Sequence, residues 1–286
     1  MYSAEVICDS IAPGNVRLTT MVVTFPRIVL AEQNTHRVFS RNTASSRAIP
    51  VETRCAAIEQ NPFVPEAFGK NQKGMQADTF LAEEENKAAE AIWREALADS
   101  LRHARALAKL GVHKQYANRL TEPFSWVTQI VTATEWDNYM NLRCHKAAQP
   151  EIKKAAELMR DALIASEPKQ LCRVGEYHLP LVSEEDKEAV GGHHEATGLL
   201  LKLSVARCAA VSYEKHNVKK SIADEVSRHD MLLSMGHMSP FEHQARVASL
   251  DEMAYNTFSG NFRAPWIQYR KTLPNEDCFI DKENHG

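Results

Sequence analysis

The sequence lacks the features of several common protein classes. Its 286 residues carry a net charge of −3 at pH 7, which argues against nonspecific nucleic-acid binding. Aromatic residues make up 7% of the chain and do not alternate with basic residues as in single-strand binders. No apolar run reaches membrane-spanning length, and no charged-then-apolar leader opens the sequence. We therefore expect a soluble, cytoplasmic protein without nucleic-acid or membrane partners.

The chain has few cysteines, and their spacing shows no paired motif. The six cysteines form no CxxC motif and stand at positions 8, 55, 144, 172, 208 and 278. This spacing indicates reduced thiols rather than a disulfide framework. Candidate metal ligands occur in one run, Gly191-Gly192-His193-His194-Glu195. No third ligand follows at a helical or hairpin spacing, so we expect a surface loop and no metal site.

The remaining composition is that of a globular protein, with 44% hydrophobic and 25% charged residues. The length allows one large domain or two modest ones, and we expect a single α/β catalytic domain over 1–286. Loose alternation predicts a strand over 17–25, ended by Pro26, with helical backbone after it. Prolines and glycines are frequent from residue 48 to residue 78. They predict a long loop or insertion over 51–78. The polar segment 166–198 is expected to be another.

Periodic apolar residues predict several helices. The clearest runs from Thr79 to Leu110, with Thr79 as its cap and a cluster of glutamates in its first turns. Further helices are predicted at about 134–144, at 150–165 with Pro150 in the first turn, and at 224–235.

The segment from His36 to Arg47 is the most informative part of the chain. It holds three arginines, three serines, a histidine and an asparagine, without an acidic residue: His36-Arg37-Val38-Phe39-Ser40-Arg41-Asn42-Thr43-Ala44-Ser45-Ser46-Arg47. Most such runs are solvated basic turns. Arginine forks and hydroxyls gathered in this way also suit a phosphate joined to a planar heterocycle.

The spacing of this segment resembles the signature of the flavin-dependent thymidylate synthases, the ThyX family. That signature is Arg-His-Arg, seven residues, then Ser, and it closes with Arg. The matching residues are His36, Arg37, Ser45 and Arg47, whereas Thr35 replaces the first arginine.

Two other segments resemble the same family. Gly236 to His243, Gly-His-Met-Ser-Pro-Phe-Glu-His, is similar to the family's Gly-His-x-Thr-Pro-Phe-Glu-His, and 206–213 resembles the segment before it. Asn138 to Arg143, followed by Ala-Gln-Pro-Glu-Ile, is similar to Asn-x-x-x-Leu-Arg followed by Ala-Gln-x-Glu-Ile. In the usual family order the Pro-Phe-Glu-His segment precedes the arginine motif. The chain therefore looks circularly permuted or rearranged, which folds tolerate when their termini lie close together.

The resemblance implies a ThyX-like fold, a mixed or antiparallel sheet flanked by long helices. It implies reductive methylation of dUMP at C5 to dTMP, with methylenetetrahydrofolate as carbon donor and FAD reduced by NADPH. It also implies a homotetramer whose sites are shared between subunits.

The matched motifs imply a role for each position. Arg143 and Ser45 would be catalytic, with the Arg143 cation stabilising charge that develops on the pyrimidine. The substrate-binding residues would be Ser45, Ser46, Arg47, Arg119 and Arg143. The flavin-binding residues would be His36, Arg37, Val38, Asn138, Leu142, His237, Ser239 and Glu242.

Several alternatives remain open. Arg143 alone could cap its own helix, and Ser239 with Glu242 could form a capping box. Glu32 and Thr43 also replace family residues, so the substrate could instead be dCMP or UMP, modified by a related methyl- or hydroxymethyltransferase. Because Thr35 replaces an arginine of the family motif, the chain could also be a non-catalytic homologue that binds a flavin or a nucleotide. The C-terminal Arg270 or Lys271 could instead restore the missing cation. A flavin mechanism leaves Cys144 dispensable.

Overall fold

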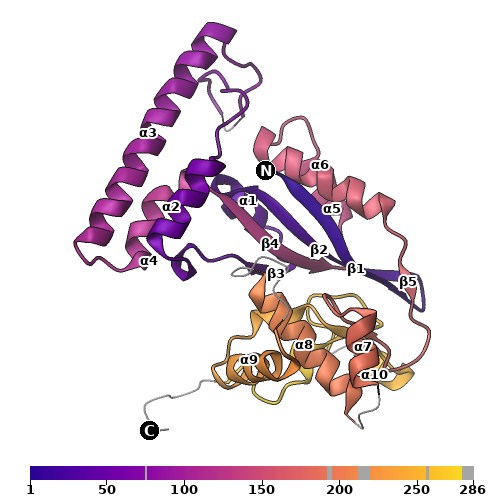
Figure 1. Cartoon of the computed structure of the whole chain (residues 1–286). Coiled ribbons are helices and arrows are strands. Elements are labelled where there is room, and N and C mark those ends of the chain that lie inside the picture. Colours follow the sequence, from indigo (N-terminus) through magenta and orange to yellow (C-terminus); the bar gives the residue numbers. More distant parts are fainter. Residues whose placement is uncertain (75, 192–194, 212–219, 256–257, 279–286) are drawn as a thin grey trace.

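Figure 1 shows the computed structural model, which describes residues 1–74, 76–191, 195–211, 220–255 and 258–278. Within these ranges no helix combines the length and apolar character needed to cross a bilayer. All six cysteines are free thiols. The same ranges contain no His, Cys, Asp and Glu cluster able to hold a metal ion, and His193 and His194 lie outside them.

A five-stranded mixed sheet forms the centre of the molecule, in the order β3-β4-β2-β1-β5. Only β5 runs parallel to its neighbour, and the other pairs are antiparallel. The strands are β1 (Ser3–Ala12), β2 (Val16–Pro26), β3 (Ser40–Thr43), β4 (Trp126–Ala133) and β5 (Lys169–Gln170). The expected α/β class and the strand ending at Pro26 are confirmed.

Alternation along β2 buries both faces of this sheet. Met21, Val23 and Phe25 point to one face and pack in a core with residues of helix α6 (Pro150–Ala165). Val22 points to the other face and packs against Cys208 of helix α8 (Ala196–Ala210). Because side chains alternate with a period of two, one strand supports a helix on each side.

Most of the other helices form two groups around the sheet, whereas α5 (Asp137–Arg143) lies beside α6 (Figure 1). One group lies beside β3 and β4 and includes the long α3, and the other contains α7 to α10. The remaining α-helices are α1 (Leu30–Asn34), α2 (Val51–Gln60), α3 (Glu83–Lys109), α4 (Lys114–Ala117), α5 (Asp137–Arg143), α7 (Glu184–Val190), α9 (Ile222–Ser234) and α10 (Leu250–Tyr255). The 3-10 helices are η1 (Arg27–Val29), η2 (Ser46–Ala48), η3 (Asn118–Phe124), η4 (Ser239–Glu242) and η5 (Tyr269–Thr272). A small sheet contains β6 (Tyr177–His178), β7 (Ala245–Val247) and β8 (Trp266–Gln268).

Three expectations need correction. The loop expected over 51–78 is wrong for 51–60, because α2 buries Cys55 and Ile58 against α3. The segment 166–198 likewise contains α7 and the short strands β5 and β6. Thr79 does not cap the long helix. That helix starts at Glu83, and the Glu85 carboxylate accepts a hydrogen bond from the Ala82 N–H at 3.1 Å.

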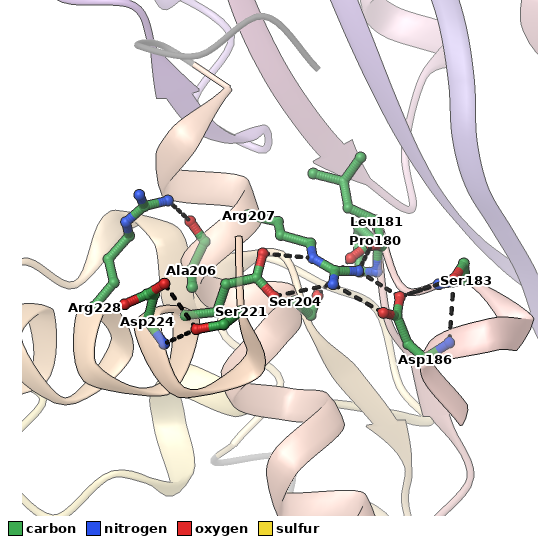
Figure 2. Close-up of polar contacts among 11 residues, drawn as sticks. Pro180, Leu181, Ser183, Asp186, Ser204, Ala206, Arg207, Ser221, Asp224 and Arg228 are labelled. Carbon is green, nitrogen blue, oxygen red and sulfur yellow. Dashed lines mark hydrogen bonds and ion pairs between the residues drawn. The ribbon is translucent and has the colours of Figure 1, made fainter. Parts of the chain in front are cut away.

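Helices α7, α8 and α9 are joined by the guanidinium of Arg207 (Figure 2). Its Nε donates to Glu225 of α9 at 2.8 Å, and its Nη2 donates to Asp186 of α7 at 2.9 Å. Its Nη1 also donates to the Leu181 carbonyl at 2.7 Å. Only 7% of the Glu225 side chain is exposed. Burying its carboxylate costs free energy, and the ion pair with Arg207 offsets that cost.

A buried chain of hydroxyls and imidazoles joins the C-terminal elements to the large sheet. The hydroxyls of Thr20 and Thr132 lie 2.7 Å apart. Thr20 contacts His178 Nε2 at 2.8 Å, and Thr132 contacts His243 Nδ1 at 2.8 Å. Burial lowers the pKa of each histidine to about 3. Both imidazoles are therefore neutral at pH 7 and act as hydrogen-bonding groups rather than charges.

Candidate functional site

The segment 35–47 runs along the edge of the large sheet and contacts three groups of residues that are distant in sequence. Its middle forms β3, whose Ser40 to Thr43 pair with Thr132 to Gln129 of β4. Because β4 holds this strand rigidly, the residues before, within and after β3 have fixed positions. These three stretches carry three groups of predicted site residues.

The first group lies before β3 and joins His36 to Arg143. The Arg143 Nε donates to His36 Nε2 at 3.0 Å. His36 is buried and packs edge-on against the ring of Tyr139, with centroids 4.8 Å apart. Burial lowers the pKa of His36, and the charges of Arg143 and Arg41 lower it further. A neutral His36 then accepts the hydrogen bond and holds the Arg143 cation in place.

Thr35 takes part in the same group. The Arg143 Nη2 donates to the Thr35 hydroxyl and to the Glu32 carbonyl, each at 3.1 Å, and the Thr35 hydroxyl donates to that carbonyl at 2.7 Å. Arg143 therefore does not simply cap its own helix, because its guanidinium binds the end of α1. The hydroxyl at position 35 orients a cation here, where a second arginine would repel it.

The second group lies on β3 and includes the C-terminal segment. The Ser239 hydroxyl donates to Asn42 Oδ1 at 3.3 Å. The Asn42 amide donates to the Cys208 carbonyl at 2.9 Å, and Gln268 donates to both Ser40 Oγ and the Glu242 carbonyl at 3.1 Å. The Pro-Phe-Glu-His segment thus packs against the strand that carries the arginine motif, despite its place far along the sequence.

Two expectations for this group are wrong. Arg270 forms an ion pair with the Glu242 carboxylate and a second one with Glu276. Among the described residues it makes no contact with Thr35, so it does not restore the missing cation there. Ser239 and Glu242 do not form a capping box either, because η4 is a single short 3-10 turn without a side-chain cap bond.

The third group lies after β3. The Ser46 hydroxyl donates to Glu122 Oε1 at 2.6 Å, and Arg119 Nη1 donates to the same atom at 2.8 Å. Arg27 Nε lies 3.0 Å from that oxygen. Ser45 caps η2 and accepts from the Arg47 N–H at 3.3 Å. Ser46 and Arg119, which are both predicted to bind the nucleotide, therefore donate to the same carboxylate oxygen. Sequence reasoning missed Arg27 and Glu122, whose only signal was a charge beside a proline.

Several predicted residues instead lie on the surface. Val38 is 42% and Leu142 50% exposed. The others with exposed side chains are Arg37, Arg47, Arg119, Asn138, His237 and Ser239. Nothing in the structure tests whether these residues bind a ligand, so their roles stay predictions.

The exposed residues are of the types that a flavin dinucleotide would need. Such a cofactor needs cations for its pyrophosphate and an apolar surface for its ring. Arg37 is exposed and forms no ion pair with any residue in the described part of the chain. Val38 follows it, and Leu142 offers a second exposed aliphatic side chain next to Arg143. These residues would hold the pyrophosphate and the ring.

A family model described as thymidylate synthase complementing protein (Thy1) matches residues 15–169. This range covers more than half of the chain and includes segment 35–47, Arg119 and Arg143. The protein therefore belongs to the thymidylate synthase complementing protein family, the ThyX family. The C-terminal segment with Ser239 and Glu242 lies outside the matched range. No curated protein sequence matches the chain.

Solved structures show a partial likeness. A UMP/dUMP methylase, PolB from Streptomyces cacaoi bound with 5-Br UMP, aligns with a TM-score of 0.48 and 15% identity, over 57% of this chain and 88% of that one. The same enzyme bound with 5-Br dUMP aligns with a TM-score of 0.47 and 16% identity, over 57% of this chain and 90% of that one.

Proposed function

We propose that this protein is a flavin-dependent thymidylate synthase, which methylates the pyrimidine of dUMP at C5. Family membership supports transfer of a one-carbon unit to a pyrimidine nucleotide. The observation that carries the proposal is the contact between His36 and Arg143 at 3.0 Å. It joins the arginine motif to the Asn-x-x-x-Leu-Arg motif, which are predicted to hold the flavin and the base.

Arg143 would activate the pyrimidine. Its guanidinium is held by His36, Thr35 and the Glu32 carbonyl, which are all neutral acceptors. Because no carboxylate of the residues that the structure describes pairs with Arg143, its positive charge is available to a ligand. A fixed cation beside the ring oxygens stabilises the negative charge that develops when C5 attacks an electrophile. The neutral form of His36 is essential, because a protonated imidazole would neither accept from Arg143 nor lie beside it without repulsion.

The remaining predicted residues divide into two sets. Ser45, Ser46, Arg47 and Arg119 would bind the phosphate and sugar. His36, Arg37, Val38, Asn138, Leu142, His237, Ser239 and Glu242 would position FAD. When bound, FAD supplies the hydride that it received from NADPH, and methylenetetrahydrofolate supplies the carbon. The exposure of Arg37, Val38 and Leu142 suits a homotetramer in which a neighbouring subunit completes each site.

One observation favours a second substrate class. A carboxylate oxygen of Glu32, Oε2, is buried and has no hydrogen-bond partner among the described residues. The backbone carbonyl of the same residue accepts from Arg143. A carboxylate oxygen can accept a hydrogen bond from the amino group of a cytosine, whereas the O4 oxygen of a uracil has no hydrogen to donate to it. C5 modification of dCMP is therefore the alternative reaction.

The test is a parallel assay of the purified protein with dUMP, UMP and dCMP, in the presence of FAD, NADPH and methylenetetrahydrofolate. We expect dTMP from dUMP and visible flavin absorbance on the isolated protein. Arg143→Ala should abolish turnover, whereas Cys144→Ala should retain most of it. Product from dCMP alone would support the alternative. Loss of activity in Cys144→Ala together with an active Arg143→Ala would contradict the mechanism.

A further inference from the structure

A single carboxylate oxygen beside Ser46 is surrounded by cationic donors. Glu122 Oε1 accepts from Ser46 Oγ at 2.6 Å and from Arg119 Nη1 at 2.8 Å, and it lies 3.0 Å from Arg27 Nε. One acceptor therefore engages three donors from η2, η3 and η1. Two arginine forks and a hydroxyl around one oxygen are also the donor set that a phosphate oxygen requires.

The charges in this cluster do not balance. Arg54 is a third cation. It is buried, and within the described part of the chain its guanidinium bonds only to the neutral hydroxyls of Thr121 and Ser125, at 2.8 and 2.9 Å. Burial lowers the pKa of Arg54 to about 10, with a further contribution from the charge of Arg27. Two guanidiniums thus contact the Glu122 carboxylate, and the charge of that carboxylate also acts on a third, Arg54. This leaves an excess of positive charge suited to a second anion.

The Glu122 carboxylate stays ionised in this position. Burial raises the pKa of Glu122, but the Ser46 hydrogen bond and the charges of Arg27 and Arg119 outweigh it, so that the pKa is lowered. At neutral pH the negatively charged Glu122 carboxylate therefore competes with an anionic ligand for the donors of Ser46, Arg27 and Arg119.

The cluster also borders a pocket. A pocket of about 480 Å³ is lined by Arg27, Asn34, Arg119 and Glu122, together with apolar side chains of η1 and α1. This volume lies within the range of small-ligand sites. Two of the cationic donors, Arg27 and Arg119, therefore face the same space as the carboxylate, and a small anion can enter that space. Arg119 is 51% exposed, so it can turn toward a ligand.

We propose that Glu122 is a built-in competitor for the nucleotide phosphate: its carboxylate holds Ser46, Arg27 and Arg119 in the absence of nucleotide, and the phosphate displaces it. This inference rests on the proposed function and adds a specificity-determining pair to it, Arg27 and Glu122. A dianionic phosphate displaces a monoanionic carboxylate, whereas a nucleoside without phosphate does not. The site therefore selects phosphorylated pyrimidines and releases them readily, because the carboxylate returns.

The test compares wild type with Glu122→Gln, which keeps the size of the side chain and removes its charge. Binding of dUMP and of deoxyuridine is measured by calorimetry. Glu52→Gln is the matched control, because Glu52 is an exposed carboxylate that pairs with Arg105 on the far helix α3. We expect dUMP to bind about tenfold more tightly to Glu122→Gln, which is about 1.4 kcal/mol. Deoxyuridine binding and the control should be unchanged.

Unchanged or weaker dUMP binding by Glu122→Gln would show that the carboxylate supports the phosphate site, and the inference would be wrong. An equal gain for deoxyuridine would also overturn it, because the effect would not be on the phosphate. If the variant does not fold, a crystal structure of wild type with dUMP decides. The phosphate should contact Ser46 and Arg119, with the Glu122 carboxylate turned away.

A crystal in which Glu122 keeps its three donors and the phosphate lies elsewhere would overturn the inference. If wild type binds none of dUMP, UMP and dCMP, the proposed function itself fails and this inference fails with it. If wild type binds and converts a nucleotide but Glu122→Gln does not bind it more tightly, only the inference fails.

Discussion

The buried imidazoles of His178 and His243 make the stability of this fold depend on pH in a calculable way. Both side chains are 0% exposed, and burial lowers the pKa of each to about 3. In the unfolded chain a histidine titrates near pH 6.5. Because the folded pKa lies below the unfolded one, the contribution of each histidine to stability is complete above pH 6.5. It is lost progressively as the pH falls toward 3.

The size of the loss between pH 6.5 and pH 5 depends only on the unfolded pKa, since the folded state binds almost no proton there. Integrating proton uptake by the unfolded chain gives about 1.7 kcal/mol for each histidine, or about 3 kcal/mol for the pair. Carboxylates add little in this window, because they titrate near pH 4 in the unfolded chain.

The assay is urea unfolding of wild type, His243→Gln and His103→Gln at pH 6.5 and pH 5. His103 lies exposed on α3 and is the control. His243→Gln should be less stable than wild type at pH 6.5 and should lose about 1.7 kcal/mol less on acidification. His103→Gln should follow wild type. Equal pH dependence in wild type and His243→Gln would show that the imidazole is not buried in its neutral form, and would refute the reasoning.

Three further outcomes follow from the structure. In urea titrations, Arg207→Ala should lower the free energy of unfolding by about 2–3 kcal/mol. This is less than the loss of a fully buried ion pair, because Arg207 is partly exposed. The control Arg105→Ala, which removes a more exposed ion pair, should leave the free energy of unfolding nearly unchanged. Arg143→Lys should lose most of its turnover, because an ammonium cannot bind His36 and two other acceptors in a fixed plane. An unchanged kcat in steady-state kinetics would contradict this prediction. The pH profile of kcat should fall once His36 becomes protonated, at a pH below the ordinary histidine pKa, and a fall above pH 7 would exclude His36 as the cause.

Local sequence signals predicted much of the fold. Pro150 and the apolar periodicity of the residues after it predicted a helix over 150–165, and α6 has these bounds. The start of α3 could not be predicted from Thr79, because tertiary pairing competes with capping. The Thr79 carbonyl accepts from the Lys70 N–H at 2.8 Å and keeps this stretch in a bridge beside Gly69. The helix therefore starts only after the bridge ends.

Contacts within the candidate site could be predicted where they join matched motifs, and not where they join residues outside any motif. The spacing of His36 and Arg143 within two family motifs placed them in one site, and the structure brings them into contact. The ion pair of Arg27 with Glu122 leaves no local pattern, because its members are separated by most of the first half of the chain. A single sequence contains no signal for such a pair beyond a charged residue next to a proline in each segment.

The most direct test is a crystal structure of the protein with FAD and dUMP. The central proposal is that segment 35–47 gathers Arg143, Glu242 and Ser46 around one bound cofactor and one bound nucleotide, within a subunit or across a subunit boundary. We predict that the pyrimidine lies against Arg143, the flavin against His36 and Ser239, and the phosphate against Ser46. A flavin and a nucleotide bound at separate surfaces, or dUMP without contact to Arg143, would contradict the proposal.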